Sequence, residues 1–241
     1  MNKQKFKDYF EGVQMVIERQ HINREKKISS YFADLNFRLD NYHQSKKLMD
    51  VYLSHDFNVF DLISPDENKL SDIISNLLDV SGTHGQGDLF LREFFSVANI
   101  SASNFSSCKI FREDATTYIT HSNRRIDITI DLDDFGIGIE NKPWALEQTD
   151  QIKDYHEHLY KKYNGNFSLV YMTGDGSPPT SIDDKLKRNL IDQGKLIMFP
   201  YPTLFIKWLK LCKRQCESEK YRWFLRDFIE YIITNFSFAE I

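Results

Sequence analysis

The sequence predicts an α/β domain with a central mixed β-sheet flanked by helices, and an extra helical arm at the N-terminus. Three observations predict it. Residues 1–50 carry apolar side chains at helical spacing, residues 108–142 have the two-residue period of strands, and helical and strand-like stretches then alternate toward the C-terminus. With 241 residues, of which 41% are hydrophobic, the chain is long enough to bury one large core.

The composition indicates a cytoplasmic protein that does not contact a membrane. No run of about 18 apolar residues occurs, and the first residues lack the apolar core of a secretory signal. The three cysteines, Cys108, Cys212 and Cys216, fit neither a disulfide framework nor a zinc ribbon. A net charge of −4 is unlike that of a general polyanion-binding protein. Any surface that binds nucleic acid should therefore be local.

The N-terminal residues 1–56 are expected to form two helices, separate from a domain over residues 57–241. One apolar face ends at Ile17, and a second face, on another side, begins at Ile28. Charged residues fill most of the remaining positions. This pattern suits an arm or a lid over the rest of the chain, and it suits a homodimer contact equally well.

A helix start is recognisable at residues 64–67. Ser64 suits the N-cap, Pro65 suits the first helical position, and Glu67 completes a capping box. Apolar residues then follow at helical spacing until about Asp79, where the turn-rich stretch SGTHGQGD begins. We therefore expect a buried helix with an acidic residue at its head, followed by a second helix that starts at LFLREFF.

Strand-like alternation covers CKIFRED, ATTYIT, RIDITIDL and FGIGIENK, and the short link DDFG predicts a hairpin between the last two. In an antiparallel hairpin the start of the first strand lies beside the end of the second, so Asp127 should neighbour Glu140. Strand alternation sends Glu140 and Lys142 to the same face. The sequence therefore predicts that three charged groups converge.

This convergence indicates metal-assisted phosphodiester chemistry. Two neighbouring carboxylates repel each other unless a cation lies between them, and hard oxygen ligands suit Mg²⁺ or Mn²⁺. Asp127 and Glu140 would hold the ion, with the carbonyl of Asn141 as a further ligand. Such an ion lowers the pKa of a bound water and polarises a phosphoryl oxygen. Lys142 would orient the water, help to deprotonate it, or stabilise charge on the phosphate.

The rest of the chain is expected to complete the sheet and its helical layers. We expect a helix over residues 143–163, a buried strand over 166–174, a helical connection over 181–194, a second strand over 195–201 and two amphipathic helices over 203–236.

The D…ExK pattern in RIDITIDLDDFGIGIENK resembles the PD-(D/E)xK nuclease superfamily, and most closely its branch of stand-alone bacterial proteins. The resemblance covers roughly residues 57–215, and Ile126 stands where the name motif has proline. It implies a restriction-endonuclease-like core, dependence on a divalent metal, DNA as substrate and a setting in bacterial defence or genome maintenance. The stretches that carry it beside the hairpin are ENKLSDIISNLLD, THGQGDLFL, EQTDQIKDY and LVYMTGDG.

The same resemblance implies roles for individual residues. Asp127 and Glu140 match the metal-binding acids, and Lys142 matches the catalytic lysine. Glu67 falls where such nucleases place a further acid on the first core helix, although the capping box explains it equally well. Gln148 or Gln151 falls where a polar residue of the next helix supports the site, although both would also suit an exposed helix face.

Three more residues are candidates for contacts with nucleic acid. Arg124 and Arg125 precede Asp127 and would contact the phosphate backbone, unless they are solvated charges. His84 would touch phosphate or transfer a proton, unless it makes a structural hydrogen bond in its turn.

Two other functions stay open. One is an RNA-directed nuclease, which the fold permits although no RNA-recognition signature is visible. The other is an inactive nuclease fold that serves as a scaffold or regulatory module, against which the complete set of three charged residues argues. The acidic net charge is also consistent with a protein partner that delivers the substrate or activates the enzyme.

Overall fold

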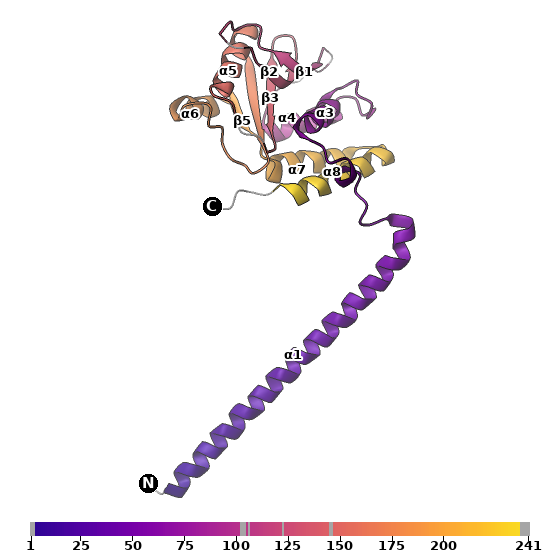
Figure 1. Ribbon diagram of the computed structural model, residues 1–241, viewed down its shortest axis with the longest axis vertical. Coiled ribbons are helices and arrows are strands. Elements are labelled where there is room, and N and C mark those ends of the chain that lie inside the picture. Colours follow the sequence, from indigo (N-terminus) through magenta and orange to yellow (C-terminus); the bar gives the residue numbers. More distant parts are fainter. Residues whose placement is uncertain (1–2, 102–104, 106, 122, 145–146, 237–241) are drawn as a thin grey trace. The chain divides into compact units, whose positions relative to one another are not determined.

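The computed structural model describes residues 3–101, 105, 107–121, 123–144 and 147–236 (Figure 1). The chain divides into two compact units, Met1–Phe57 and Asn58–Ile241. Each unit is described by itself below.

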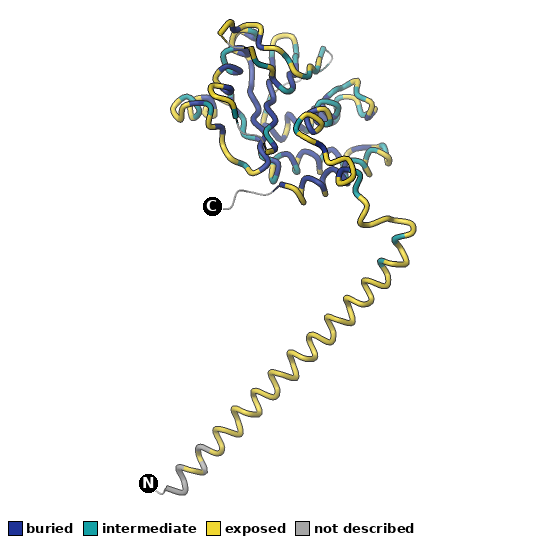
Figure 2. The backbone as a smooth tube through the Cα atoms, in the orientation of Figure 1, coloured by how far each residue is buried: buried dark blue, intermediate teal, exposed yellow. Residues whose placement is uncertain are grey.

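The first unit is one helix, α1, which spans Lys3–Leu53. The prediction of two helices was wrong. The apolar face does change between Ile17 and Ile28, but the chain holds no proline before Pro65, so nothing forces a break there. Ion pairs one turn apart, such as Arg38 with Asp34, support the exposed helix. From residue 11 to residue 45 every side chain is exposed (Figure 2).

The second unit is built on a mixed sheet, as predicted, and this sheet has five strands. The sheet order is β1-β2-β3-β4-β5, with β1, β2 and β3 antiparallel and β3, β4 and β5 parallel. The predicted strand over residues 115–120 is wrong, because most of this stretch forms turns after β1. The strands are β1 (Lys109–Ala115), β2 (Arg125–Asp131), β3 (Gly136–Lys142), β4 (Phe167–Thr173) and β5 (Leu196–Met198).

Helices cover both faces of this sheet and make a separate apolar core with each. The larger core joins one face to α2 (Val59–Ile63), α3 (Glu67–Leu78), α4 (Leu89–Ala98), the single π-helical turn η1 (Tyr201–Phe205), α7 (Ile206–Gln215) and α8 (Glu219–Asn235). The smaller core joins the other face to α5 (Gln151–Lys162) and α6 (Asp184–Asp192). The two cores together hold the sheet between two helical layers.

Two glycines of β3 let α5 lie close to the sheet. A Cβ atom at Gly136 would come within 2.0 Å of the Tyr163 ring, and one at Gly138 would come within 2.8 Å of Leu159. Gly136 therefore has no room for a side chain, because a methyl group there would overlap the Tyr163 ring just after α5, whereas at Gly138 the nearest atom is the tip of the flexible Leu159 side chain. This close approach brings the first turn of α5 to the end of β3.

The start of α3 differs from the predicted capping box. Ser64 ends α2 in a left-handed conformation, with φ of 43°. Asp66 is the N-cap of α3, and its carboxylate accepts a hydrogen bond from the Lys69 amide at 2.8 Å. The Glu67 carboxylate is therefore not needed as the helix cap and is available for a contact with another residue. The helix ends at Leu78 with Asp79 as its C-cap, which agrees with the predicted end near Asp79.

None of the described helices is both long enough and apolar enough to cross a membrane.

Candidate active site

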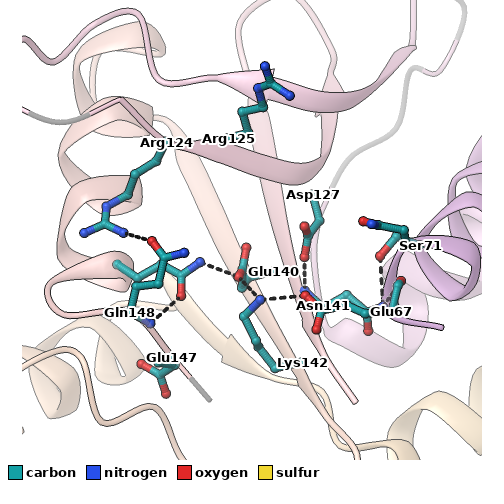
Figure 3. A network of polar contacts seen from close by, with 12 residues as sticks. Glu67, Ser71, Arg124, Arg125, Asp127, Glu140, Asn141, Lys142, Glu147 and Gln148 are labelled. Atoms are coloured by element: carbon teal, nitrogen blue, oxygen red, sulfur yellow. Dashed lines mark hydrogen bonds and ion pairs between the residues drawn. The ribbon is translucent and has the colours of Figure 1, made fainter. Parts of the chain in front are cut away.

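The predicted hairpin of β2 and β3 forms and brings Asp127 beside the end of β3 (Figure 3). Ile128 pairs with Ile139, so the next step of the same register places Asp127 opposite Glu140. At that point the Asp127 carboxylate accepts a hydrogen bond from the backbone amide of Asn141 at 2.7 Å. The strands thus hold the two acids at one position in the sheet.

Lys142 lies between two glutamates. Its Nζ atom is 2.8 Å from Glu140 Oε1 and 2.7 Å from Glu67 Oε1 at the head of α3. The lysine side chain is only 10% exposed. Burial by itself would lower the pKa of Lys142, but the two carboxylates outweigh it and raise that pKa above its ordinary value. Lys142 is therefore held as a cation.

Glu140 is completely buried, and only one of its two oxygens is satisfied. Oε1 faces Lys142 and accepts a hydrogen bond from Gln151 at 2.6 Å. Oε2 has no hydrogen-bond partner among the described residues. Burial, and then the neighbouring Asp127, raise the pKa of Glu140 to about 8 in spite of Lys142. Burial also raises the pKa of Asp127. Both acids are thus unfavourable as anions without a further cation.

These residues fit a divalent cation. No group of three His, Cys, Asp or Glu side chains in the described part of the chain could hold a metal by itself. Mg²⁺, however, commonly binds through one or two carboxylates and keeps several water ligands. The unpartnered Glu140 Oε2 beside Asp127 is a buried carboxyl oxygen that a cation could take as a ligand. The carbonyl of Asn141 is the further ligand that the sequence suggests.

Helix α5 supports the site through Gln151, its first residue. Gln151 donates from Nε2 to Glu140 and also contacts the Tyr155 hydroxyl at 3.0 Å. The predicted helix start at residue 143 is wrong, because α5 begins at Gln151, so Gln148 lies in the loop before it. The backbone amide of Gln148 donates to Gln151 Oε1 at 3.1 Å. Gln148 therefore acts on the site through its backbone and Gln151 through its side chain.

The two arginines before Asp127 differ in their surroundings. Arg124 is 16% exposed and binds the carboxylate of Asp154 at 2.6 Å, the side chain of Gln148 at 2.7 Å and the carbonyl of Thr149. Through these contacts Arg124 links the loop before α5 to the start of β2. The side chain of Arg125 is 68% exposed and only 3.5 Å from Glu113. Arg125 is the arginine that can still contact a phosphate.

Asn141 links the site to the larger core. Its side chain receives a hydrogen bond from the Tyr201 hydroxyl at 2.7 Å and donates to Ser71 Oγ at 2.9 Å. Sequence reasoning missed Ser71, Tyr155 and Tyr201 as supporting residues. Helical spacing could have found the first two, because Ser71 is four residues after Glu67 and Tyr155 is four after Gln151. Nothing in the sequence points to Tyr201.

The structure does not bring His84 into these contacts. It is buried, its Nε2 lies 2.8 Å from the Asp79 carbonyl, and its Nδ1 accepts a hydrogen bond from the Gln86 amide at 3.0 Å. Both ring nitrogens are thus used inside its own loop. This arrangement matches the structural alternative for His84.

A cavity of about 480 Å³ opens beside the charged cluster. Lys142 lines it together with Trp144, which is 53% exposed, and Tyr171. Thr173 also lines it, and the Thr173 hydroxyl has no hydrogen-bond partner among the described residues. A substrate in this cavity would lie next to the Lys142 side chain.

A family model described as the PD-(D/E)XK nuclease superfamily matches residues 57–230, which is more than two thirds of the chain. Searches of curated proteins and of solved structures gave no match.

Proposed function

Because the chain belongs to the PD-(D/E)XK nuclease superfamily, we propose that it is a divalent-metal-dependent nuclease that hydrolyses phosphodiester bonds in DNA. One observation carries this proposal. The buried carboxylate of Glu140 lies beside Asp127 with one oxygen unpartnered among the described residues, and burial opposes its ionisation. A cation would remove this conflict. The fold thus brings together two carboxyl groups that a bound metal would stabilise as anions.

In this proposal Asp127 and Glu140 hold Mg²⁺ or Mn²⁺, with the carbonyl of Asn141 as a further ligand. The bound ion would supply an activated water and polarise the phosphoryl oxygen. Lys142 remains protonated between Glu67 and Glu140. It therefore serves by donating hydrogen bonds and stabilising negative charge on the phosphate, since a proton-accepting lysine would need a lowered pKa. Gln151 fixes the orientation of Glu140.

The substrate would approach through the cavity beside Lys142. Arg125 is exposed near the start of β2 and can contact the phosphate backbone there. The net charge of −4 makes unaided binding to DNA weak, which favours a protein partner that delivers the substrate. A bacterial defence role in the cytoplasm is proposed with it, on the family resemblance and the composition.

The test is cleavage of supercoiled plasmid, linear duplex, single-stranded DNA and RNA in Mg²⁺, Mn²⁺ or EDTA. We expect cleavage of DNA with either metal and none in EDTA. Asp127→Asn and Lys142→Ala should each abolish it. Asp131→Asn is the matched control, because Asp131 is at the other end of the same strand, where its carboxylate accepts a hydrogen bond from the Asp133 amide in the hairpin turn. It should cleave like the wild type.

Other outcomes would change the conclusion. Cleavage of RNA but not DNA would replace the DNA assignment with an RNA-directed nuclease. A wild-type protein that neither cleaves nor binds Mn²⁺ in a calorimetric titration would contradict the proposal and favour the scaffold function. Metal binding without cleavage would leave the metal site in place and require the delivering partner.

A further inference from the structure

Helix α1 carries an apolar seam, defined here as positions 28, 32, 35, 39, 42, 46, 49 and 53. The spacing between successive positions alternates between four and three residues, which is the heptad repeat of a coiled coil. Seven of the eight are apolar, and their exposed fractions run from 37% at Leu35 to 60% at Tyr42. The seam residues are Ile28, Phe32, Leu35, Leu39, Tyr42, Lys46, Met49 and Leu53.

An exposed seam of this length needs a partner. A helix in a protein gains most of its stability from packing its apolar face against another element. Apolar heptads sustained over three to four repeats indicate that this element is another helix of a coiled coil. The seam covers residues 28–53, which corresponds to about 39 Å of helix. The sequence repeats the same spacing at residues 6, 10, 13 and 17.

The length of the seam indicates which helix can pack against it. A repeat with a 3.5-residue period stays in contact only with another helix that supercoils around it over the same distance. The longest helix of the other unit, α8, has 17 residues, against 51 in α1. Among the described elements, only a second α1 has the matching length and period.

Lys46 is the one charged residue in the seam, and its charge is already paired. Its Nζ atom lies 2.6 Å from both carboxylate oxygens of Asp56 in the same chain. The lysine side chain is 24% exposed, so its aliphatic stem lies along the helix. The seam can therefore close around this position without an unpaired charge, and a single polar residue at such a position fixes the register of the two helices.

We propose that α1 is a dimerisation helix whose seam packs against the seam of a second copy of this chain in a two-stranded coiled coil. This inference goes beyond the nuclease function and is independent of it. The dimer carries two nuclease units on one α-helical stem.

Light scattering during size-exclusion chromatography tests the proposal on the full chain. We expect the wild type to have twice the 28.5 kDa mass of one chain. The seam double variant Leu35→Asp/Leu39→Asp should have the mass of one chain. The matched control Phe37→Asp/Val51→Asp changes two apolar residues that are 66% and 82% exposed and lie opposite the seam in the heptad. It should remain dimeric.

A milder pair separates packing from helix formation. Leu35→Ala/Leu39→Ala keeps a strong helix former at both positions and should still raise the dimer dissociation constant at least about a hundredfold. Phe37→Ala/Val51→Ala should leave it unchanged. A monomeric wild type would overturn the proposal, as would a seam variant that stays dimeric or a control that dissociates equally. A mass of three or more copies would overturn the two-stranded arrangement.

Discussion

At the scale of single residues, Glu140 is the residue at which the requirements of metal binding and of stable folding oppose each other. Its carboxylate is buried next to Asp127, and only one of its oxygens is satisfied by Lys142 and Gln151. The ionised form of Glu140 therefore destabilises the metal-free fold, and the same ionised form is the one that binds a cation. A substitution that removes the charge should separate the two effects.

We predict that Glu140→Gln stabilises the metal-free protein at high pH. The pKa of Glu140 is raised to about 8 in the fold, so wild-type stability falls as the pH rises from about 4.5 through about 8. Glutamine lacks this titration. In thermal unfolding with EDTA, the Tm of the variant should exceed that of the wild type by at least about 2 °C at pH 8.5. The difference should shrink toward pH 5.

The control for this experiment is Glu217→Gln, which changes an exposed glutamate far along the chain. It should follow the pH dependence of the wild type. A Tm difference for Glu140→Gln that stays constant with pH would show that the glutamate does not titrate in this range.

The two glutamines near the site give a second prediction. Gln151→Ala removes the side chain that orients Glu140 and should lower kcat about 10- to 100-fold with little change in KM. Gln148→Ala keeps the backbone amide that bonds Gln151, so it should change kcat far less. Steady-state cleavage of one DNA substrate by both variants measures this. Equal losses would show that Gln151 has no special positioning role.

Sequence reasoning could predict the convergence of Asp127, Glu140 and Lys142, because hairpin register and strand alternation are local rules. It could not predict the conflict at Glu140, which arises from burial under α5. It also connected Glu67 with a cap, whereas Asp66 caps α3 and Glu67 reaches Lys142. Because Asp66 and Glu67 are adjacent acidic residues, tertiary contacts decide which of them caps α3 and which contacts Lys142.

At the scale of elements, the junction between β2 and the loop before α5 depends on Arg124. We predict that Arg124→Ala destabilises the fold by about 2 kcal/mol or more, because it leaves the buried Asp154 without this ion pair. Arg125→Ala should barely change stability and should weaken DNA binding, with the salt dependence reduced by about one unit of slope.

Denaturant unfolding and DNA binding at several salt concentrations check this pair of variants. The opposite assignment, with Arg124 affecting only DNA affinity and Arg125 affecting stability, would contradict the geometry. Lys142→Met gives a cleavage-deficient background for the binding measurements.

The elements also show where sequence patterns fail. The predicted helix over residues 143–163 begins only at Gln151, because the loop before it is held by groups distant in the sequence. Glu147, for example, accepts hydrogen bonds from the Tyr171 hydroxyl and from the Thr180 and Ser181 amides. A local pattern contains no information about such partners. The mixed sheet flanked by helices was predictable, since it follows from the alternation of segment types along the chain.

At the scale of the whole molecule, the buried apolar residues all lie between Phe60 and Phe236 among those described. We therefore predict that a chain of residues 58–241 folds without α1 and keeps the cooperative unfolding transition of this unit. Its Tm should match that of the corresponding transition in the full chain, and its mass should be that of a monomer. Calorimetry and light scattering check both points.

A truncated chain that does not fold would show that α1 contributes to the stability of the second unit. A truncated chain that folds and remains dimeric would place the self-association outside the seam. The sequence indicated a separate helical segment, but its two apolar faces suggested two helices. Only the uninterrupted backbone of α1 shows that they belong to one helix.

Gly136 in β3 carries a consequence for genetics. It belongs neither to the proposed metal ligands nor to the residues proposed to contact the substrate, yet a side chain there would collide with the Tyr163 ring just after α5 and displace the helix that carries Gln151. In a selection for mutants that have lost nuclease activity, substitutions at Gly136 should be recovered beside those at the acidic residues. Such a selection would then identify as essential a residue that takes no part in the reaction.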